Sequence, residues 1–134
     1  MVAFGAALLS GCTVEWRREH ATSCRGDEQP LIRDTLYFGA SIPGGGEVDG
    51  DTWIQFENDT LTPAFPNGYT IVPAHGLWRG EDGTTTTEAS RIVIIVHADT
   101  HSSAAAVRDV ASRYRERFHQ QSVLHEHSVV CAQF

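Results

Sequence analysis

Lysine is absent from this sequence, and all ten of its basic residues are arginine. The 17 acidic residues outnumber them, so the formal net charge is −7 with histidine neutral. A net negative surface repels the phosphates of a nucleic-acid backbone, and we therefore expect no nucleic acid among the partners of this chain. We ascribe the missing lysine to genomic composition and attach no mechanism to it.

Long hydrophobic runs and catalytic motifs are missing as well. No apolar run approaches the roughly 18 residues that a membrane-spanning helix needs. The chain has no Gly-x-Ser-x-Gly nucleophile elbow and no Cys-x-x-Cys pair, and its triple glycine at 44–46 lacks the lysine and the spacing of a phosphate-binding loop. The sequence therefore predicts no catalytic residue and no cofactor.

A short apolar stretch opens the chain, over residues 2–9, and ends in the letters LSGC, the last of which is Cys12. This pattern is typical of a bacterial lipoprotein signal, although no basic residue precedes the apolar run. The alternative is that the stretch is no signal and forms a buried N-terminal helix or the end of a strand. We expect residues 1–11 to be a signal remnant, residues 12–30 a charged tether, and Cys12 the lipidated residue. The protein would then be exported and anchored to a membrane of the bacterial cell envelope through this lipid.

Residues 31–134 are predicted to form one α+β domain. Period-two alternation or branched aliphatic runs indicate strands at 31–43, 68–80, 90–99 and 122–134. Apolar residues at helical spacing indicate helices at 48–66 and 102–119. Pro63 and Pro66 are expected to end the first helix. This order predicts a ferredoxin-like sandwich, with a four-stranded antiparallel sheet in the order 4-1-3-2 and both helices on one face. Pro73 suits the edge strand, and the aliphatic run from Ile92 to Val96 suits a central strand.

Two cysteines besides Cys12 are placed close together by this topology. The first and last strands are antiparallel neighbours, so Cys24 before the first lies near Cys131 at the end of the last. A disulfide needs Cα atoms within about 7 Å, and an exported compartment permits one. We hypothesise that they pair; the alternative is two unrelated thiols.

Two groups of side chains are candidates for binding. His125 and His127 alternate along the last strand at the spacing of a metal pair, but further ligands are expected only from strands that are not its neighbours, so no metal site is predicted. Trp78 could provide a stacking surface, and the guanidinium of Arg79 could bind an anion. The alternative for that pair is a tryptophan packed on the sheet and covered by the arginine.

The face of the sheet without helices is the expected binding surface, because an apolar face left uncovered marks an interface or a ligand groove. On it we place Tyr37, His97, His125 and His127, with Arg33 at its rim. A one-residue slip in register would invert this assignment.

Several separated stretches resemble a known family. They include TLYFGASIPGG, LTPAFPNGYTIVPAHGLWRGEDG and the SVL that follows YRERFHQQ. Together they are similar to the bacterial family catalogued as domain of unknown function 3574, over about residues 34–134. The resemblance implies a small exported protein, often with a lipoprotein signal, and it implies no activity. Its pattern includes Tyr37-Phe38-Gly39 and Leu77-Trp78-Arg79.

Two functions follow as hypotheses. The first is a non-catalytic envelope lipoprotein whose open sheet face binds a partner, such as a second copy of the chain in a homodimer. The alternative is a small-ligand binder or cofactor-free enzyme of the dimeric α+β barrel type, with Tyr37, His97 and Arg79 in an apolar pocket. A concave pocket on the open face, lined by these three residues, would favour the alternative.

Overall fold

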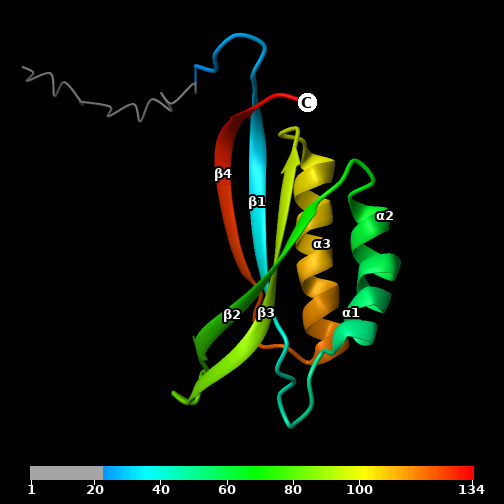
Figure 1. Cartoon of the computed structure of the whole chain (residues 1–134), viewed down its shortest axis with the longest axis vertical. Helices are drawn as coiled ribbons and strands as arrows, with labels where there is room; N and C mark the ends of the chain where they lie inside the picture. Colours follow the sequence, from blue (N-terminus) through cyan, green and yellow to red (C-terminus); the bar gives the residue numbers. More distant parts are fainter. Residues whose placement is uncertain (1–22) are drawn as a thin grey trace, which may run out of the picture.

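The computed structural model describes residues 23–134, and the predicted lipidation site Cys12 lies outside them. The elements run β1 (Gln29–Gly39), α1 (Gly50–Phe56), η1 (Glu57–Leu61), α2 (Thr62–Ala64), β2 (Thr70–Arg79), β3 (Thr85–His97), α3 (His101–Phe118) and β4 (Leu124–Ala132). The strands form one antiparallel sheet in the order β2-β3-β1-β4 (Figure 1).

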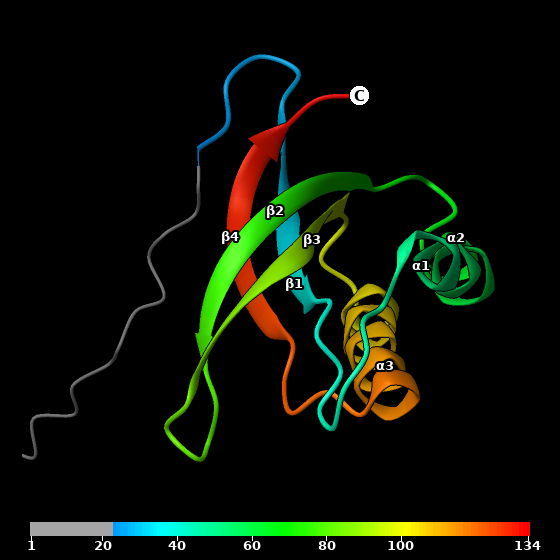
Figure 2. The same ribbon diagram turned by 60° about the horizontal axis from the view of Figure 1, so that its bottom comes forward.

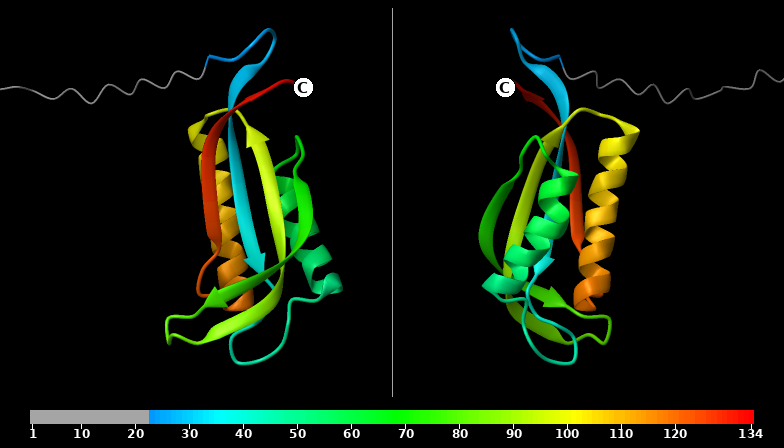
Figure 3. Two further views of the ribbon diagram at one scale, coloured as in Figure 1. Left: turned by 60° about the vertical axis from the view of Figure 1, so that its left-hand side comes forward. Right: turned by 90° about the vertical axis from the view of Figure 1, so that its right-hand side faces the viewer.

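This arrangement confirms the predicted ferredoxin-like fold, since β2-β3-β1-β4 is the order 4-1-3-2 counted from the other edge. The edge strand β2 carries Pro73, which lacks the N–H that a second neighbouring strand would require. All helices pack on the same face of the sheet and leave the other face uncovered (Figure 3). No helix within residues 23–134 is long and apolar enough to cross a membrane.

The core lies between this face and the helices. Ile32, Leu36 and Phe38 alternate along β1 and are buried, as the period-two pattern predicts. Tyr114 of α3 is fully buried among them, with its ring edge-on to Phe38 at 4.6 Å between centroids. Its hydroxyl donates a hydrogen bond to the Gly39 carbonyl at 2.7 Å, and burial raises the pKa of Tyr114, so the hydroxyl remains a donor.

The β2–β3 hairpin is longer than the sequence predicts. Strand β3 begins at Thr85 and not near Ser90, because the threonine run that looks like a polar turn continues the ladder as β-branched residues favour. The turn is confined to residues 80–84, where Gly83 has a φ of 82°. The hairpin therefore projects past the rest of the sheet, at the end where β1 stops (Figure 2).

The first helical segment continues beyond Pro63, the first of the two prolines that were predicted to end it. Pro63 lies inside the last turn, at a position where the missing N–H breaks no required bond. A π-helical turn precedes it, in which the Thr62 N–H donates to the Glu57 carbonyl five residues earlier. The helix ends at Ala64, before Pro66.

The predicted disulfide is confirmed. Cys24 and Cys131 are bonded, with their Cα atoms 5.4 Å apart and 107 residues between them in sequence. Cys131 lies opposite Pro30 in the β1–β4 ladder, so the bond joins the start of β1 to the end of β4.

We expect reduction of this disulfide to lower the free energy of unfolding by about 4 kcal/mol, because a cross-link over a loop this long restricts the unfolded chain strongly. Urea denaturation of a Cys12→Ser chain, oxidised and reduced, measures the difference. The same chain with Cys24→Ser and Cys131→Ser is the control and should not respond to reductant. Equal stabilities of the oxidised and reduced chains would contradict the expectation.

Candidate functional site

The structure divides the six predicted binding residues into two groups of three. Tyr37, Trp78 and Arg79 line a cleft of about 430 Å³. Tyr37 and Trp78 belong to the helix-free face of the sheet, and Arg79 joins the lining from the end of β2, next to the hairpin turn. The three histidines lie on the opposite, helix-bearing face, so their predicted place on the open face is wrong.

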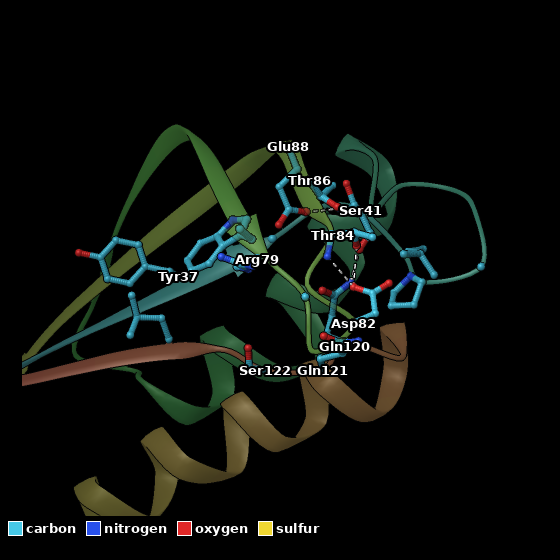
Figure 4. Close-up of a pocket in the computed structure, with 17 residues that line it drawn as sticks. Tyr37, Ser41, Arg79, Asp82, Thr84, Thr86, Glu88, Gln120, Gln121 and Ser122 are labelled. Carbon is cyan, nitrogen blue, oxygen red and sulfur yellow. Dashed lines mark hydrogen bonds between the residues drawn. The ribbon is translucent and has the colours of Figure 1, made fainter.

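Three chain segments build the cleft at one end of the sheet (Figure 4). They are the β2–β3 hairpin, the loop that leaves β1, and the connection from α3 to β4. The lining residues are Tyr37, Gly39, Ser41, Ile42, Pro43, Gly44, Trp78, Arg79, Gly80, Asp82, Thr84, Thr86, Glu88, Gln120, Gln121, Ser122 and Leu124. Aromatic rings, amides, hydroxyls and charged groups thus meet in one concavity.

Glu88 lies on the floor of the cleft because Gly39 has no side chain. A Cβ at Gly39 would overlap the Glu88 carboxylate, which contacts the strand directly. The Ser41 backbone N–H donates to the carboxylate at 2.6 Å and holds it in place (Figure 4). The requirement for glycine after Phe38 therefore has a physical reason, since any larger residue would displace Glu88.

Trp78 lies over a second glycine. A Cβ at Gly76 would come within 3.0 Å of the indole nitrogen Nε1 of Trp78 and 3.5 Å of the Ser90 hydroxyl. Within residues 23–134, the Nε1 of Trp78 and the hydroxyl of Ser90 are buried without a hydrogen-bond partner. The indole is thus partly packed against the sheet, as the packing alternative predicts, and its remaining surface lines the cleft.

Tyr37 is held as a neutral phenol at the β4 side of the cleft. Its hydroxyl donates to Glu126 Oε2 at 2.8 Å. This hydrogen bond, with burial and the charge of Glu126, raises the pKa of Tyr37 against the opposing charge of Arg33. At neutral pH the group can donate or stack, but it does not act as a base.

At the hairpin end of the cleft, Asp82 provides a second carboxylate. Its Oδ1 accepts hydrogen bonds from the Thr84 hydroxyl at 2.7 Å and from the Thr84 backbone N–H at 2.9 Å. These bonds lower the pKa of Asp82, so it is ionised at neutral pH. The lining of the cleft therefore contains two carboxylates, those of Glu88 and Asp82, and one guanidinium, that of Arg79.

The histidine group is placed by the register of β1. His97 lies opposite Ile32, His125 opposite Leu36, and His127 opposite Asp34. Directly opposed residues of antiparallel strands project to the same face of the sheet. The three imidazoles therefore lie on the helix-bearing face, as the buried side chains of β1 do.

Asp34 joins the three histidines and was not predicted as a site residue. Its side chain is only 2% exposed. Oδ2 is 2.6 Å from His97 Nε2, and Oδ1 is 2.7 Å from His125 Nε2 and 2.9 Å from His127 Nδ1. Burial alone would raise the pKa of Asp34, but the three hydrogen bonds and the charge of His125 together lower it, so the carboxylate is ionised.

The sequence contains the signal that would have identified Asp34. It occupies a core-facing position of β1, two residues after Ile32 and two before Leu36, where a charged residue is out of pattern. A buried charge needs partners, and β1 lies between the two strands that carry His97, His125 and His127. A neighbour of β4 therefore supplies a third side chain of a type that can ligate a metal, whereas we expected such side chains only from strands that are not its neighbours.

Comparison with known proteins gives a family and a fold. The sequence model described as "Protein of unknown function (DUF3574)" matches residues 33–134. No curated protein matches the chain.

Among solved structures, a phage SAM lyase in complex with S-methyl-5′-thioadenosine has a TM-score of 0.61 and 16% identity, covering 85% of this chain and 95% of that one. A phage SAM lyase in the apo state has a TM-score of 0.58 and 18% identity, covering 84% and 96%. At these identities the similarity concerns the fold alone.

We expect Asp34→Asn to lower the free energy of unfolding by about 2 kcal/mol, because hydrogen bonds to a buried charged group are worth about 1.5–3 kcal/mol. Asp109→Asn is the matched control, since Asp109 forms an exposed ion pair with Arg113 at 2.7 Å and such a pair contributes less than about 1 kcal/mol. Urea denaturation of chelator-treated protein measures both variants. Equal effects of the two substitutions would show that the Asp34 network does not stabilise the fold.

Proposed function

Because the chain belongs to the DUF3574 family of proteins of unknown function, we propose its function from its own site: it binds a small, flat-ringed, neutral or cationic molecule in the cleft of the open sheet face, without catalysis. A nucleoside is the class of ligand that fits this description best.

The combination of shape and chemistry in the cleft carries the proposal. Its volume of about 430 Å³ is within the range of small-molecule sites, about 300–1,000 Å³. The rings of Tyr37 and Trp78 offer surfaces for stacking, and Glu88 and Asp82 can accept hydrogen bonds from amino or hydroxyl groups. With two carboxylates and one guanidinium in its lining, the cleft disfavours anions such as nucleotides.

The fold comparison supports the ligand class without establishing it. A phage SAM lyase of similar fold binds S-methyl-5′-thioadenosine. A protein of this fold can therefore bind a nucleoside derivative, while the choice of ligand for this chain rests on its own cleft.

A binding role is preferred to catalysis because the catalytic set expected for the enzyme alternative is divided. That alternative places Tyr37, His97 and Arg79 in one pocket, but His97 lies on the opposite face of the sheet. Within residues 23–134, no imidazole lines the cleft, and Tyr37 is a neutral phenol bonded to Glu126. Neither His97 nor Tyr37 can therefore serve as the general base in the cleft.

A second copy of the chain is the competing occupant of the open face. Val72 and Leu124 lie on this face and are 41% and 46% exposed. A homodimer through these residues would cover the cleft as well. The oligomeric state in solution therefore has to be measured together with ligand binding.

We expect Trp78→Ala to weaken binding of adenosine or S-methyl-5′-thioadenosine by tenfold or more, since stacking of a base on an aromatic ring is worth about 1–3 kcal/mol. Leu77→Ala is the control, because Leu77 is the adjacent residue of β2, points to the other face and is 69% exposed. Isothermal titration calorimetry measures the affinities, and light scattering gives the mass.

Saturable binding by a monomer that is lost in Trp78→Ala and kept in Leu77→Ala is the expected result. Two results would overturn the proposal. One is that neither nucleoside binds in the millimolar range. The other is a stable dimer that Val72→Glu converts to a monomer without exposing any nucleoside binding.

We further propose that the protein is an exported lipoprotein of the bacterial cell envelope, anchored through Cys12. The Cys24–Cys131 disulfide supports export, because structural disulfides persist in oxidising compartments and are rare in the cytosol. The short apolar stretch before Cys12 supports the lipid.

Mass spectrometry of the protein from a bacterial membrane fraction tests this proposal. We expect a lipid adduct on Cys12 and a mass two hydrogens below that of the reduced chain. Cys12→Ser should move the protein out of the membrane fraction and leave the disulfide intact. A wild-type chain with an unmodified Cys12 in the soluble fraction would contradict the proposal.

A further inference from the structure

Asp34 is a buried charge whose partners are all imidazoles. Its side chain is 2% exposed on the apolar face of β1, between Ile32 and Leu36. Burial of a carboxylate costs several kcal/mol unless the group is paired or ligates a metal ion. In the part of the chain that the structure describes, its side-chain partners are the three histidines and no arginine.

Two of these imidazoles converge on one oxygen. His125 Nε2 lies 2.7 Å and His127 Nδ1 lies 2.9 Å from Asp34 Oδ1. The three residues each offer a ligand atom within 4.8 Å of the other two. Ligands about 2.1 Å from a tetrahedral ion are roughly 3.4 Å from one another. Side-chain adjustments of about 1 Å would therefore bring this set around one ion, well within rotamer freedom.

His97 fixes the other oxygen of the carboxylate. Its Nε2 lies 2.6 Å from Asp34 Oδ2, and its Nδ1 lies 2.8 Å from the Ala98 carbonyl. Both ring nitrogens thus face acceptors, and the ring is anchored at both ends. Such a hydrogen bond to the outer oxygen of a ligating carboxylate is the usual means by which proteins orient a metal ligand.

The pair of histidines is open to solvent on the side away from the core. The side chain of His125 is 35% exposed and that of His127 is 58% exposed, against 13% for His97. An ion can therefore enter from solvent, and water can fill the coordination positions that the protein leaves open.

We propose that Asp34, His125 and His127 bind one divalent transition-metal ion of the zinc class, with His97 as a positioning residue. Two imidazoles and one carboxylate are a ligand set suited to zinc and its neighbours and not to calcium or magnesium. Before binding, His125 Nε2 and His127 Nδ1 carry the protons that they donate to Asp34 Oδ1. On binding, each of these nitrogens gives up its proton, which moves to the other ring nitrogen, or to solvent where that nitrogen is already protonated, and offers its lone pair to the ion. The site lies on the opposite face of the sheet from the cleft, so it does not depend on the proposed nucleoside binding.

Titration of zinc chloride into the full chain tests the proposal. The protein carries Cys12→Ser, has its disulfide intact and no affinity tag, and is stripped of metal by chelator and dialysis. Calorimetry gives the stoichiometry and affinity, and the visible absorption of added cobalt(II) reports the ligand geometry. We expect one ion per chain.

The variant His125→Ala with His127→Ala should weaken zinc binding by at least about 100-fold, since even outer partners of a metal ligand are worth about 10–100-fold. The matched control is His75→Ala with His119→Asn, which removes two histidines elsewhere and should change the affinity less than about twofold. Asparagine is chosen because residue 119 has a φ of 54°, and asparagine tolerates it.

His97→Gln separates positioning from ligation. It should weaken zinc by about 10–100-fold and leave the cobalt(II) band positions unchanged, because the ligand atoms are the same. If the double alanine variant fails to fold by circular dichroism, His127→Gln at the most exposed ligand replaces it and should shift the cobalt(II) bands.

Three results would overturn the proposal. The first is the absence of saturable zinc binding by the folded chain in the millimolar range. The second is equal binding by the variants that lack His125 and His127 and by their control. The third is a cobalt(II) spectrum that these substitutions leave unchanged.

Discussion

The central position of β1 is the constraint on which the rest of the domain depends. This strand is hydrogen-bonded to β3 on one side and to β4 on the other, so its two-residue alternation is imposed on both neighbours. The even-numbered residues from Ile32 to Phe38 face the helices, and the odd-numbered ones face the uncovered side. The pairing with β1 therefore decides to which face each side chain of β3 and β4 projects. It thereby decides which of these side chains belong to the cleft and which to the Asp34–histidine cluster.

Much of the fold could be predicted from local signals in the sequence. Pro73 marks the edge strand and the run from Ile92 to Val96 marks an inner one, because each reflects a hydrogen-bonding or burial requirement of that single strand. The topology placed Cys24 near Cys131, and an exported compartment permits a disulfide, so their pairing could be hypothesised from the sequence. The start of β3 was misplaced because threonines are common in turns as well as strands, and Pro63 failed to end a helix whose preceding turn is π-helical.

The faces of the histidines were not predictable from β4 itself. That strand is mostly exposed on both sides, so its hydrophobic alternation is too weak to identify the buried face. Only its pairing with β1 places His125 opposite Leu36 and His127 opposite Asp34. An ionised residue in the apolar alternation of β1 was the informative feature, because a buried carboxylate requires partners that its neighbouring strands must supply.

The two carboxylates at these sites show how burial sets the number of partners. Glu88, half-buried in the cleft, is held by one backbone N–H from Ser41 and lies over Gly39. Asp34, almost fully buried, takes three imidazoles. Solvent supplies the remaining hydrogen bonds of Glu88, whereas Asp34 must find them all within the protein.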